Sequence, residues 1–96
     1  MSGFITREEA RSLLDQGGVV LDVRTIEEYQ LGHAPESLHI PVHLVAHLAA
    51  ERLPAGCPLL VCCASGARSH LATLQLRQMG YDAYNLGPWV CHPDLS

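Results

Sequence analysis

The sequence predicts an α/β fold in which a mostly parallel central sheet is covered by helices on both faces. Two short apolar runs, VVLDV at 19–23 and LLVCC at 59–63, have the composition of buried strands. Each run is followed by a segment with helical signals, and this alternation is typical of a parallel sheet. A length of 96 residues fits one compact domain, so we expect a single domain over residues 1–96.

The first helix is predicted to begin after Thr6, because Thr6 and Glu9 have the spacing of a capping box. Its apolar face would consist of Ala10, Leu13 and Leu14. The glycine pair at 17–18 ends this helix, and the strand at 19–23 follows. A second capping box, Thr25 with Glu28, opens a short helix that runs through residue 29.

Turn residues and apolar runs define the rest of the chain. Pro41 suits the first turn of a helix, and Gly80 is a stop signal for another. The further expected elements are an extended piece at 38–40, a helix from 41 to about 53, a helix from about 68 to 79 and a last strand at 82–86.

Composition excludes several classes of partner. The net charge is −4, with ten acidic residues and six arginines, so we expect no nucleic-acid partner. No apolar run approaches the length of about 18 residues that spans a membrane, and the N-terminus lacks the order of a signal peptide. We therefore expect a cytoplasmic protein without a membrane partner, and a monomer at this size.

The four cysteines are read as thiols, because adjacent Cys62 and Cys63 cannot easily pair with each other in a disulfide framework. A metal site is not expected. His43, His47 and Glu51 have helical spacing that suits a metal, but a solvated polar face explains them at least as well. Zinc bound by Cys57 and Cys63 fails on distance, since the mostly extended chain between them separates them by about 15–20 Å. No cofactor is implied.

The segment CASGARS at 63–69 has the properties of an anion-binding loop. It joins a strand end to a helix start, where backbone N–H groups and the helix dipole favour negative charge. Gly66 permits a turn with positive φ, Ala64 and Ala67 leave the interior uncrowded, and Arg68 adds a fixed cation. Ser69 could cap the helix or donate its hydroxyl to a bound guest. A cysteine at this position would have a lowered pKa.

Two cysteines compete for the role of nucleophile. Counted from Cys62, a tyrosine-phosphatase signature would need glycine at position 65, where Ser65 stands. Gly66 fits the register that starts at Cys63. Cys62 is then the preceding strand residue, and its side chain points to the opposite face of the sheet. We therefore expect Cys63 to be the reactive thiol and Cys62 to pack in the core.

Two stretches with these residues resemble single-domain rhodaneses, which are sulfurtransferases. CASGARS resembles the C-x-x-G-x-R-S loop of that family. LDVRTIEEYQLGHAPESLHIP at 21–41 resembles its D-V-R-x-x-x-E-Y-x-x-G-H-I-P-G-A-x-x-I-P stretch, with departures at Glu36 and Ser37. NLGPWVCHP at 85–93 resembles the L-x-G-G segment, but Pro88 replaces its second glycine. The resemblance spans nearly the whole chain.

The resemblance implies that Cys63 accepts a sulfane sulfur as a persulfide and passes it on. The donor would be thiosulfate or a protein persulfide, and the acceptor cyanide or a thiol such as that of glutathione or thioredoxin. The loop Ala64, Ser65, Gly66, Ala67, Arg68 and Ser69 would bind the substrate, with Arg68 on the sulfonate end of thiosulfate. Loop length separates this family from related phosphatases and arsenate reductases, whose loop is one residue longer.

Several alternatives stay open at the level of sequence. A binding module with the same fold and no catalysis is the second hypothesis, and phosphatase or arsenate reductase chemistry is the third. Arg68 could instead form a structural salt bridge with Asp22 or Glu28. Four residues at family positions are expected to orient loops rather than to react: Asp22, Arg24, Glu28 and His33. Cys91 is a candidate resolving thiol for an oxidised or persulfidated Cys63.

Overall fold

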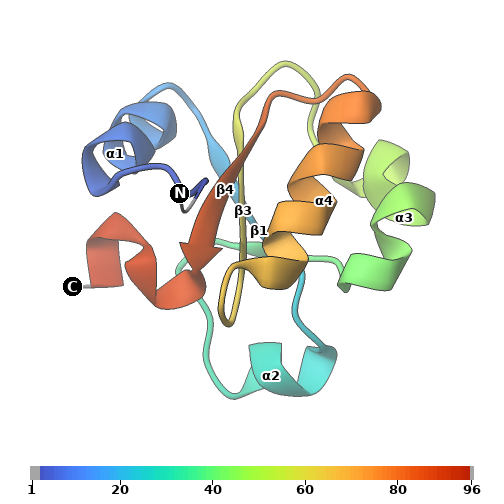
Figure 1. The fold of residues 1–96 in the computed structure, drawn as a ribbon, viewed down its shortest axis with the longest axis horizontal. Helices are drawn as coiled ribbons and strands as arrows, with labels where there is room; N and C mark the ends of the chain where they lie inside the picture. Colours follow the sequence, from blue (N-terminus) through green and yellow to red (C-terminus); the bar gives the residue numbers. More distant parts are fainter. Residues whose placement is uncertain (1–2, 96) are drawn as a thin grey trace.

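Four parallel strands form one sheet in the computed structural model, which describes residues 3–95 (Figure 1). The order across the sheet is β2-β1-β3-β4, so β3 lies between β1 and β4. The strands are β1 Val19–Asp22, β2 Leu38–His39, β3 Leu59–Cys63 and β4 Ala83–Pro88. The predicted parallel sheet is confirmed, and the last strand extends two residues beyond the predicted end.

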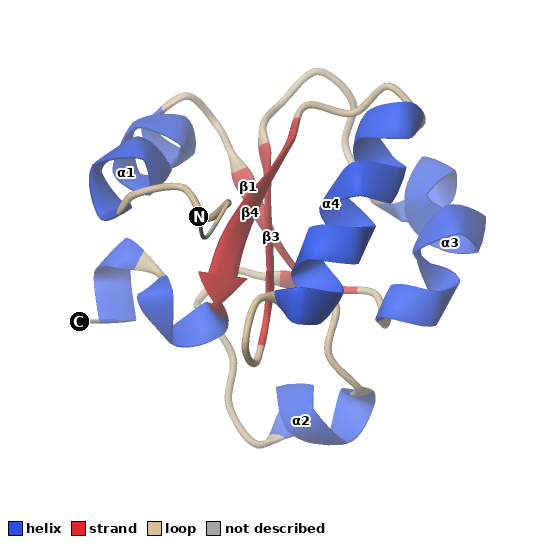
Figure 2. Cartoon of the chain, in the orientation of Figure 1, coloured by secondary structure: helices blue, strands red, loops and turns tan. Residues whose placement is uncertain are grey.

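Helices cover both faces of this sheet, as predicted (Figure 2). α1 lies on one face with the C-terminal 3₁₀ turns, while α3 and α4 lie on the other. The α-helices are α1 Arg7–Asp15, α2 Ile26–Gln30, α3 Val45–Arg52 and α4 Ala67–Gln78, and the 3₁₀ turns are η1 Val42–Leu44, η2 Trp89–Cys91 and η3 Pro93–Leu95. Within residues 3–95 none of the helices is both long and apolar enough to cross a membrane.

Both predicted capping boxes are present. In α1 the Thr6 hydroxyl accepts from the Glu9 N–H at 3.0 Å, and the Glu9 carboxylate accepts from the Thr6 N–H at 2.7 Å. The same reciprocal pair joins Thr25 and Glu28 at the start of α2. α2 has five residues and none of them is buried, so its cap contributes much of what fixes the position of Glu28.

The helix expected from residue 41 to 53 is divided in two. Residues Val42–Leu44 form a 3₁₀ turn, in which the Leu44 N–H donates to the Pro41 carbonyl, and the α-helix begins only at Val45. The Val42 N–H donates to the Val23 carbonyl at 3.0 Å, so the sheet holds this first turn in the tighter geometry. His43 therefore lies outside the helix that contains His47, and the expected helical spacing of the two is wrong.

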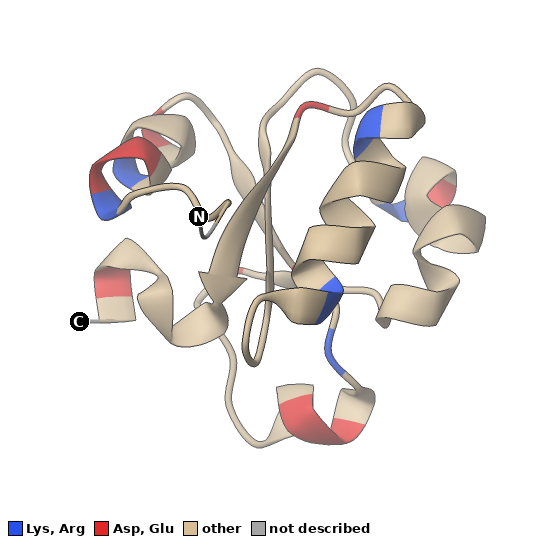
Figure 3. Ribbon diagram, viewed as in Figure 1, with Lys and Arg blue, Asp and Glu red and all other residues tan. Residues whose placement is uncertain are grey.

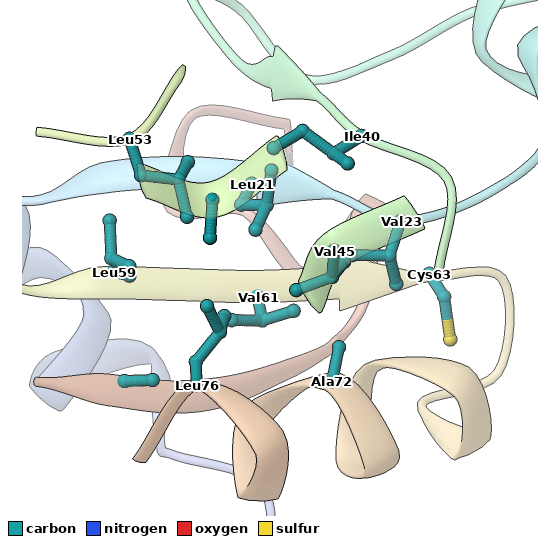
Figure 4. Close-up of a cluster of buried hydrophobic side chains, with 12 residues drawn as sticks. Leu21, Val23, Ile40, Val45, Leu53, Leu59, Val61, Cys63, Ala72 and Leu76 are labelled. Atoms are coloured by element: carbon teal, nitrogen blue, oxygen red, sulfur yellow. The ribbon is translucent and has the colours of Figure 1, made fainter. Parts of the chain in front are cut away.

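Alternate residues of β3 belong to two different cores. Leu59, Val61 and Cys63 pack on the face covered by α3 and α4 (Figure 4). Leu60 and Cys62 pack on the opposite face, against α1. This alternation follows from the period of a strand, and it confirms that the two adjacent cysteine side chains lie on opposite sides of the sheet.

Candidate functional site

The candidate site lies at the carboxyl end of the sheet, where Cys63 ends β3. Figure 4 shows Cys63 as the last residue of its core row, with its sulfur directed toward the start of α4. The loop that follows connects β3 directly to α4, and α2 lies beyond the same end of the sheet (Figure 1). Parallel sheets bind their ligands at this end, because the loops there converge on one crevice.

Backbone donors converge on the Cys63 sulfur. The Gly66 N–H lies 3.0 Å from Sγ, and the Ser69 N–H lies 3.4 Å from it. The first contact depends on the left-handed backbone of Gly66, which has φ +100°. Both groups belong to the N-terminal end of α4, where the helix dipole adds partial positive charge.

These contacts decide the ionisation of Cys63. The sulfur is fully buried, and burial alone would raise the pKa of the thiol. Hydrogen bonds of the sulfur with the Ser69 hydroxyl and N–H, and with the N–H groups of Gly66 and Ser65, outweigh burial and lower the pKa below its ordinary value. A thiolate stabilised in this way is a nucleophile that needs no separate general base.

The Ser69 hydroxyl links the sulfur to β4. The Cys63 thiol donates to Ser69 Oγ at 3.4 Å, and the Ser69 hydroxyl donates to Asn85 Oδ1 at 2.7 Å. Ser69 is not the helix cap, since Gly66 holds that position and no side chain caps α4. Asn85 was not among the residues predicted for the site. A polar residue between apolar neighbours in the predicted last strand was the signal in the sequence.

Cys62 has the opposite character. Its thiol is fully buried on the far face of the sheet, and burial together with the nearby charge of Asp22 raises its pKa. A protonated, buried thiol is a poor nucleophile. The register of the loop and the pKa shifts of the two thiols therefore both favour Cys63 over Cys62 as the candidate nucleophile.

Arg68 forms an ion pair with Glu28 at the rim of the site. Its Nη1 and Nη2 donate to the two carboxylate oxygens of Glu28 at 2.7 and 3.0 Å. Both side chains are 34% exposed, and Figure 3 shows the acidic α2 below the basic first turn of α4. The hydrogen bond from Arg68, with the backbone contact at Thr25, lowers the pKa of Glu28 from 4.5 to about 2. One alternative raised by the sequence, a salt bridge between Arg68 and Glu28, is thus present.

Asp22 and Arg24 form a second, buried pair that braces the segment around α2. Arg24 Nη2 donates to the Asp22 carboxylate at 2.8 Å and to the Gly32 carbonyl at 2.6 Å. Its guanidinium lies 4.8 Å from the ring centre of Trp89. His33 stacks on Tyr29, with ring centres 3.8 Å apart. The hydrogen bonds of Arg24 and His33 run to this supporting framework and none of them reaches the Cys63 sulfur.

The other predicted residues line the outside of the loop or lie apart from it. Ala64, Ser65 and Ala67 are exposed, and the Ser65 hydroxyl accepts from the Ala67 N–H at 3.4 Å. Cys91 is an exposed free thiol in η2, and it takes no part in the hydrogen bonds of Cys63, so its resolving role stays a prediction. In the described part of the chain, no three His, Cys, Asp or Glu side chains are grouped so that they could hold a metal ion.

Phe4 supports the loop from outside and was missed in the sequence. A Cβ added to Gly66 would lie 2.3 Å from the Phe4 ring, and one added to Gly87 would lie 2.9 Å from it. The ring therefore packs directly on the backbone of both glycines. The segment before α1 is held in place by the Ile5 N–H, which donates to the Asn85 carbonyl at 3.0 Å.

Comparison with known proteins gives consistent matches over most of the chain. The rhodanese-like domain family matches residues 6–87. Thiosulfate sulfurtransferase GlpE of Pseudomonas paraeruginosa is 40% identical over 84 residues, covering 85% of this chain and 74% of the relative. The protein of the same name from Pseudomonas fluorescens is 38% identical over 90 residues, covering 90% of this chain and 81% of the relative.

Solved structures show the same fold. A rhodanese-related protein from Thermoplasma volcanium has a TM-score of 0.77 at 25% identity, covering 91% of this chain and 85% of the other. A rhodanese homologue from Thermus thermophilus has a TM-score of 0.70 at 30% identity, covering 90% and 94%. The human single-domain sulfurtransferase TSTD1 has a TM-score of 0.68 at 29% identity, covering 91% and 90%.

Proposed function

The chain belongs to the rhodanese-like family, and from that premise we propose that it is a thiosulfate sulfurtransferase that carries the transferred sulfur on Cys63. The observation that carries the assignment to Cys63 is the convergence of the Gly66 and Ser69 N–H groups on its sulfur. The predicted sulfurtransferase class agrees with the named activity of the relatives that match most of the chain.

The reaction balances in two displacements. The Cys63 thiolate attacks the outer sulfur of thiosulfate, the S–S bond of thiosulfate breaks, and sulfite leaves with the electron pair. Cys63 then carries a persulfide with one negative charge. Cyanide attacks the outer sulfur of that persulfide, the new S–S bond breaks, and thiocyanate leaves while the Cys63 thiolate is restored. No external oxidant, reductant or metal enters either step.

The loop supplies what each displacement needs. Negative charge resides on sulfur in the thiolate and in the persulfide, and fixed N–H donors stabilise it without reorganising. Arg68 can bind the sulfonate end of thiosulfate while it holds Glu28, because a guanidinium has five N–H groups and Glu28 takes two of them. The Glu28 pair also fixes the direction of the guanidinium before substrate arrives.

Other sulfur donors and acceptors could react by the same two displacements. A protein persulfide could replace thiosulfate as donor, and a thiol such as that of glutathione or thioredoxin could replace cyanide as acceptor, since each offers the same type of sulfur centre. We place the protein in the cytoplasm, where reducing conditions keep Cys63 as a free thiol. We further propose that it acts as a monomer, because one chain supplies the whole loop and its supports.

The rate of thiocyanate formation from thiosulfate and cyanide tests this function. Cys63→Ser should lower the rate to that of the uncatalysed reaction, because serine cannot carry a sulfane sulfur. Cys62→Ala is the matched control at the adjacent position, and it should retain most of the rate, since Cys62 lies on the other face of the sheet. An active Cys63→Ser protein, or a Cys62→Ala protein as inactive as Cys63→Ser, would contradict the assignment.

A further inference from the structure

Asn85 is the polar centre of the contact between the loop and β4. It is 3% exposed, and its side-chain amide makes hydrogen bonds to three residues, two at the start of α4 and one in β4. Oδ1 accepts from the Ser69 hydroxyl at 2.7 Å and from the Gly87 N–H at 2.9 Å, and Nδ2 donates to the Gly66 carbonyl at 3.2 Å. A buried amide with this set of partners holds all of them in one arrangement.

An irregularity in β4 accompanies this side chain. Val61 of β3 is paired with Asn85, but the next residue, Cys62, is paired with Gly87, so one extra residue is inserted into β4. Gly87 has φ +88°, a conformation that favours glycine. Bulges of this kind re-aim side chains and are common beside active sites. Here the bulge lets the Gly87 N–H turn back to the Asn85 amide.

Two routes lead from the Asn85 amide to the Cys63 sulfur. One passes through Gly66, whose carbonyl accepts from Asn85 Nδ2 and whose N–H donates to Sγ at 3.0 Å. The other passes through the Ser69 hydroxyl, which lies 3.4 Å from Sγ and 2.7 Å from Asn85 Oδ1. Asn85 therefore fixes two of the groups that surround the sulfur without touching it.

We propose that Asn85 is a positioning residue for the reactive thiol, holding the Gly66 peptide and the Ser69 hydroxyl so that both address the Cys63 sulfur. As a step in sulfur transfer, this inference rests on the proposed role of Cys63. It extends the site from the loop to β4, and it assigns a function to a residue outside the loop motif.

The Ser69 hydroxyl has one proton, so at any time it can donate either to Asn85 Oδ1 or to the Cys63 sulfur. In the thiol form the Cys63 S–H donates to Ser69 and the Ser69 hydroxyl donates to Asn85. In the thiolate form the Ser69 proton turns to the sulfur, and Asn85 Oδ1 keeps the Gly87 N–H as its donor. Asn85 thus accommodates both ionisation states of Cys63 without an unpaired buried oxygen.

The charged groups at this end of the sheet are arranged in pairs. Arg68 of α4 is paired with Glu28 of α2, and Asp22 of β1 is paired with Arg24. Substitution of Asn85 by alanine changes none of these charges. A change in the ionisation of Cys63 in that variant would therefore come from the lost amide contacts.

The test is the pH at which Cys63 is half-ionised, measured from its rate of alkylation by iodoacetamide across pH. The parent protein carries Cys57→Ser and Cys91→Ser, so that Cys63 is the reactive thiol followed by mass. Asn85→Ala should move the midpoint upward by about half a unit or more, because the Gly66 N–H is then no longer held on the sulfur. Such a shift lowers the ratio of thiolate to thiol at a given pH about threefold. A role confined to stability would leave the midpoint of the folded protein unchanged.

Three further variants sharpen the result. Asn85→Asp keeps the two acceptor contacts but adds negative charge near the sulfur, so its midpoint should rise further than that of Asn85→Ala. In a Ser69→Ala background, Asn85→Ala should still raise the midpoint, because the route through the Gly66 peptide is intact there. Thr73→Val is the control for a buried polar residue on α4: the Thr73 hydroxyl has no partner in the described chain, and its loss should not move the midpoint.

The outcomes separate the inference from the proposed function. If the parent protein gains sulfur from thiosulfate while both Asn85 variants titrate like the parent, the positioning role is overturned and the function stands. If the midpoints shift but the parent gains no sulfur, the positioning of the thiol is supported and the proposed function fails. If neither Asn85 variant folds, the midpoint of Ser69→Ala is the remaining test, and an unchanged midpoint there would overturn the route from Asn85 through the Ser69 hydroxyl.

Discussion

Arg68 is shared between a carboxylate of the protein and the anion that we propose it binds. Glu28 holds two of its N–H groups, and this pair is only partly shielded from solvent. An exposed pair of this kind contributes little to stability. Its larger effect is to keep the guanidinium at the rim of the loop, where a second anion can use the remaining donors.

Replacement of Arg68 by alanine should therefore affect substrate more than folding. We expect kcat/KM for thiosulfate to fall about 10- to 100-fold, as for the loss of a charge-assisted hydrogen bond worth about 1.5–3 kcal/mol. Arg77→Ala is the control on the same helix, because Arg77 donates to the Ala83 carbonyl and does not contact the loop. Steady-state kinetics of the two variants check this, and equal losses in both would refute a specific role for Arg68.

At the scale of elements, the connection from β3 to α4 is built on backbone rather than on side chains. The Gly66 backbone is left-handed, its N–H points to the sulfur, and the Phe4 ring covers its other side. These three constraints meet at one residue. A side chain at position 66 would have to displace either the ring or the peptide that stabilises the thiolate.

Gly66→Ala should consequently cost more than a positive φ alone explains. Gly80 is the matched control, since its φ is +96° but a Cβ there would meet nothing within 4 Å. Gly80→Ala should lower the free energy of unfolding by about 1–2 kcal/mol, the cost of left-handed backbone. Urea denaturation should show a clearly larger loss for Gly66→Ala, partly recovered when Phe4→Ala is added. Equal losses at both glycines would show that the Phe4 contact has no energetic effect.

The sequence predicted most elements because their signals are local. β3 was predicted with its observed bounds, since a short apolar run between turn residues is typical of a buried strand. Both capping boxes were found for the same reason. The 3₁₀ turn at 42–44 was missed, because it depends on a hydrogen bond to Val23 from a distant strand. Local pattern cannot show such a contact.

The site was predicted only in part, because only some of its residues are neighbours in the sequence. The loop 63–69 is continuous in sequence, so its residue types and spacing were visible. Asn85 and Phe4 reach the loop only through the pairing of β3 with β4 and the packing of the N-terminal segment. The ion pair of Arg68 with Glu28 was one of two alternatives, and the choice between Asp22 and Glu28 needed the position of α2.

The whole molecule separates two adjacent cysteines into two chemical environments. The sheet places Cys62 in the core beside α1 and Cys63 in the core beside α4. The Cys63 side chain faces the loop and the start of α4, and among residues 3–95 its sulfur alone of the two receives hydrogen bonds from backbone N–H groups. The difference between the two thiols follows from the fold, because adjacent residues of a strand face opposite sides of the sheet.

The role of Cys63 as sulfur carrier is tested most directly by the intact mass of the reduced protein after brief exposure to thiosulfate, measured beside Cys63→Ser. We expect the unaltered protein to gain the mass of one sulfur atom, cyanide to remove it, and Cys63→Ser to gain nothing. Cys62→Ala should gain sulfur like the unaltered protein. No gain by a protein whose Cys63 is shown to be free and reduced, or an equal gain by Cys63→Ser, would contradict the central claim that Cys63 carries the sulfur.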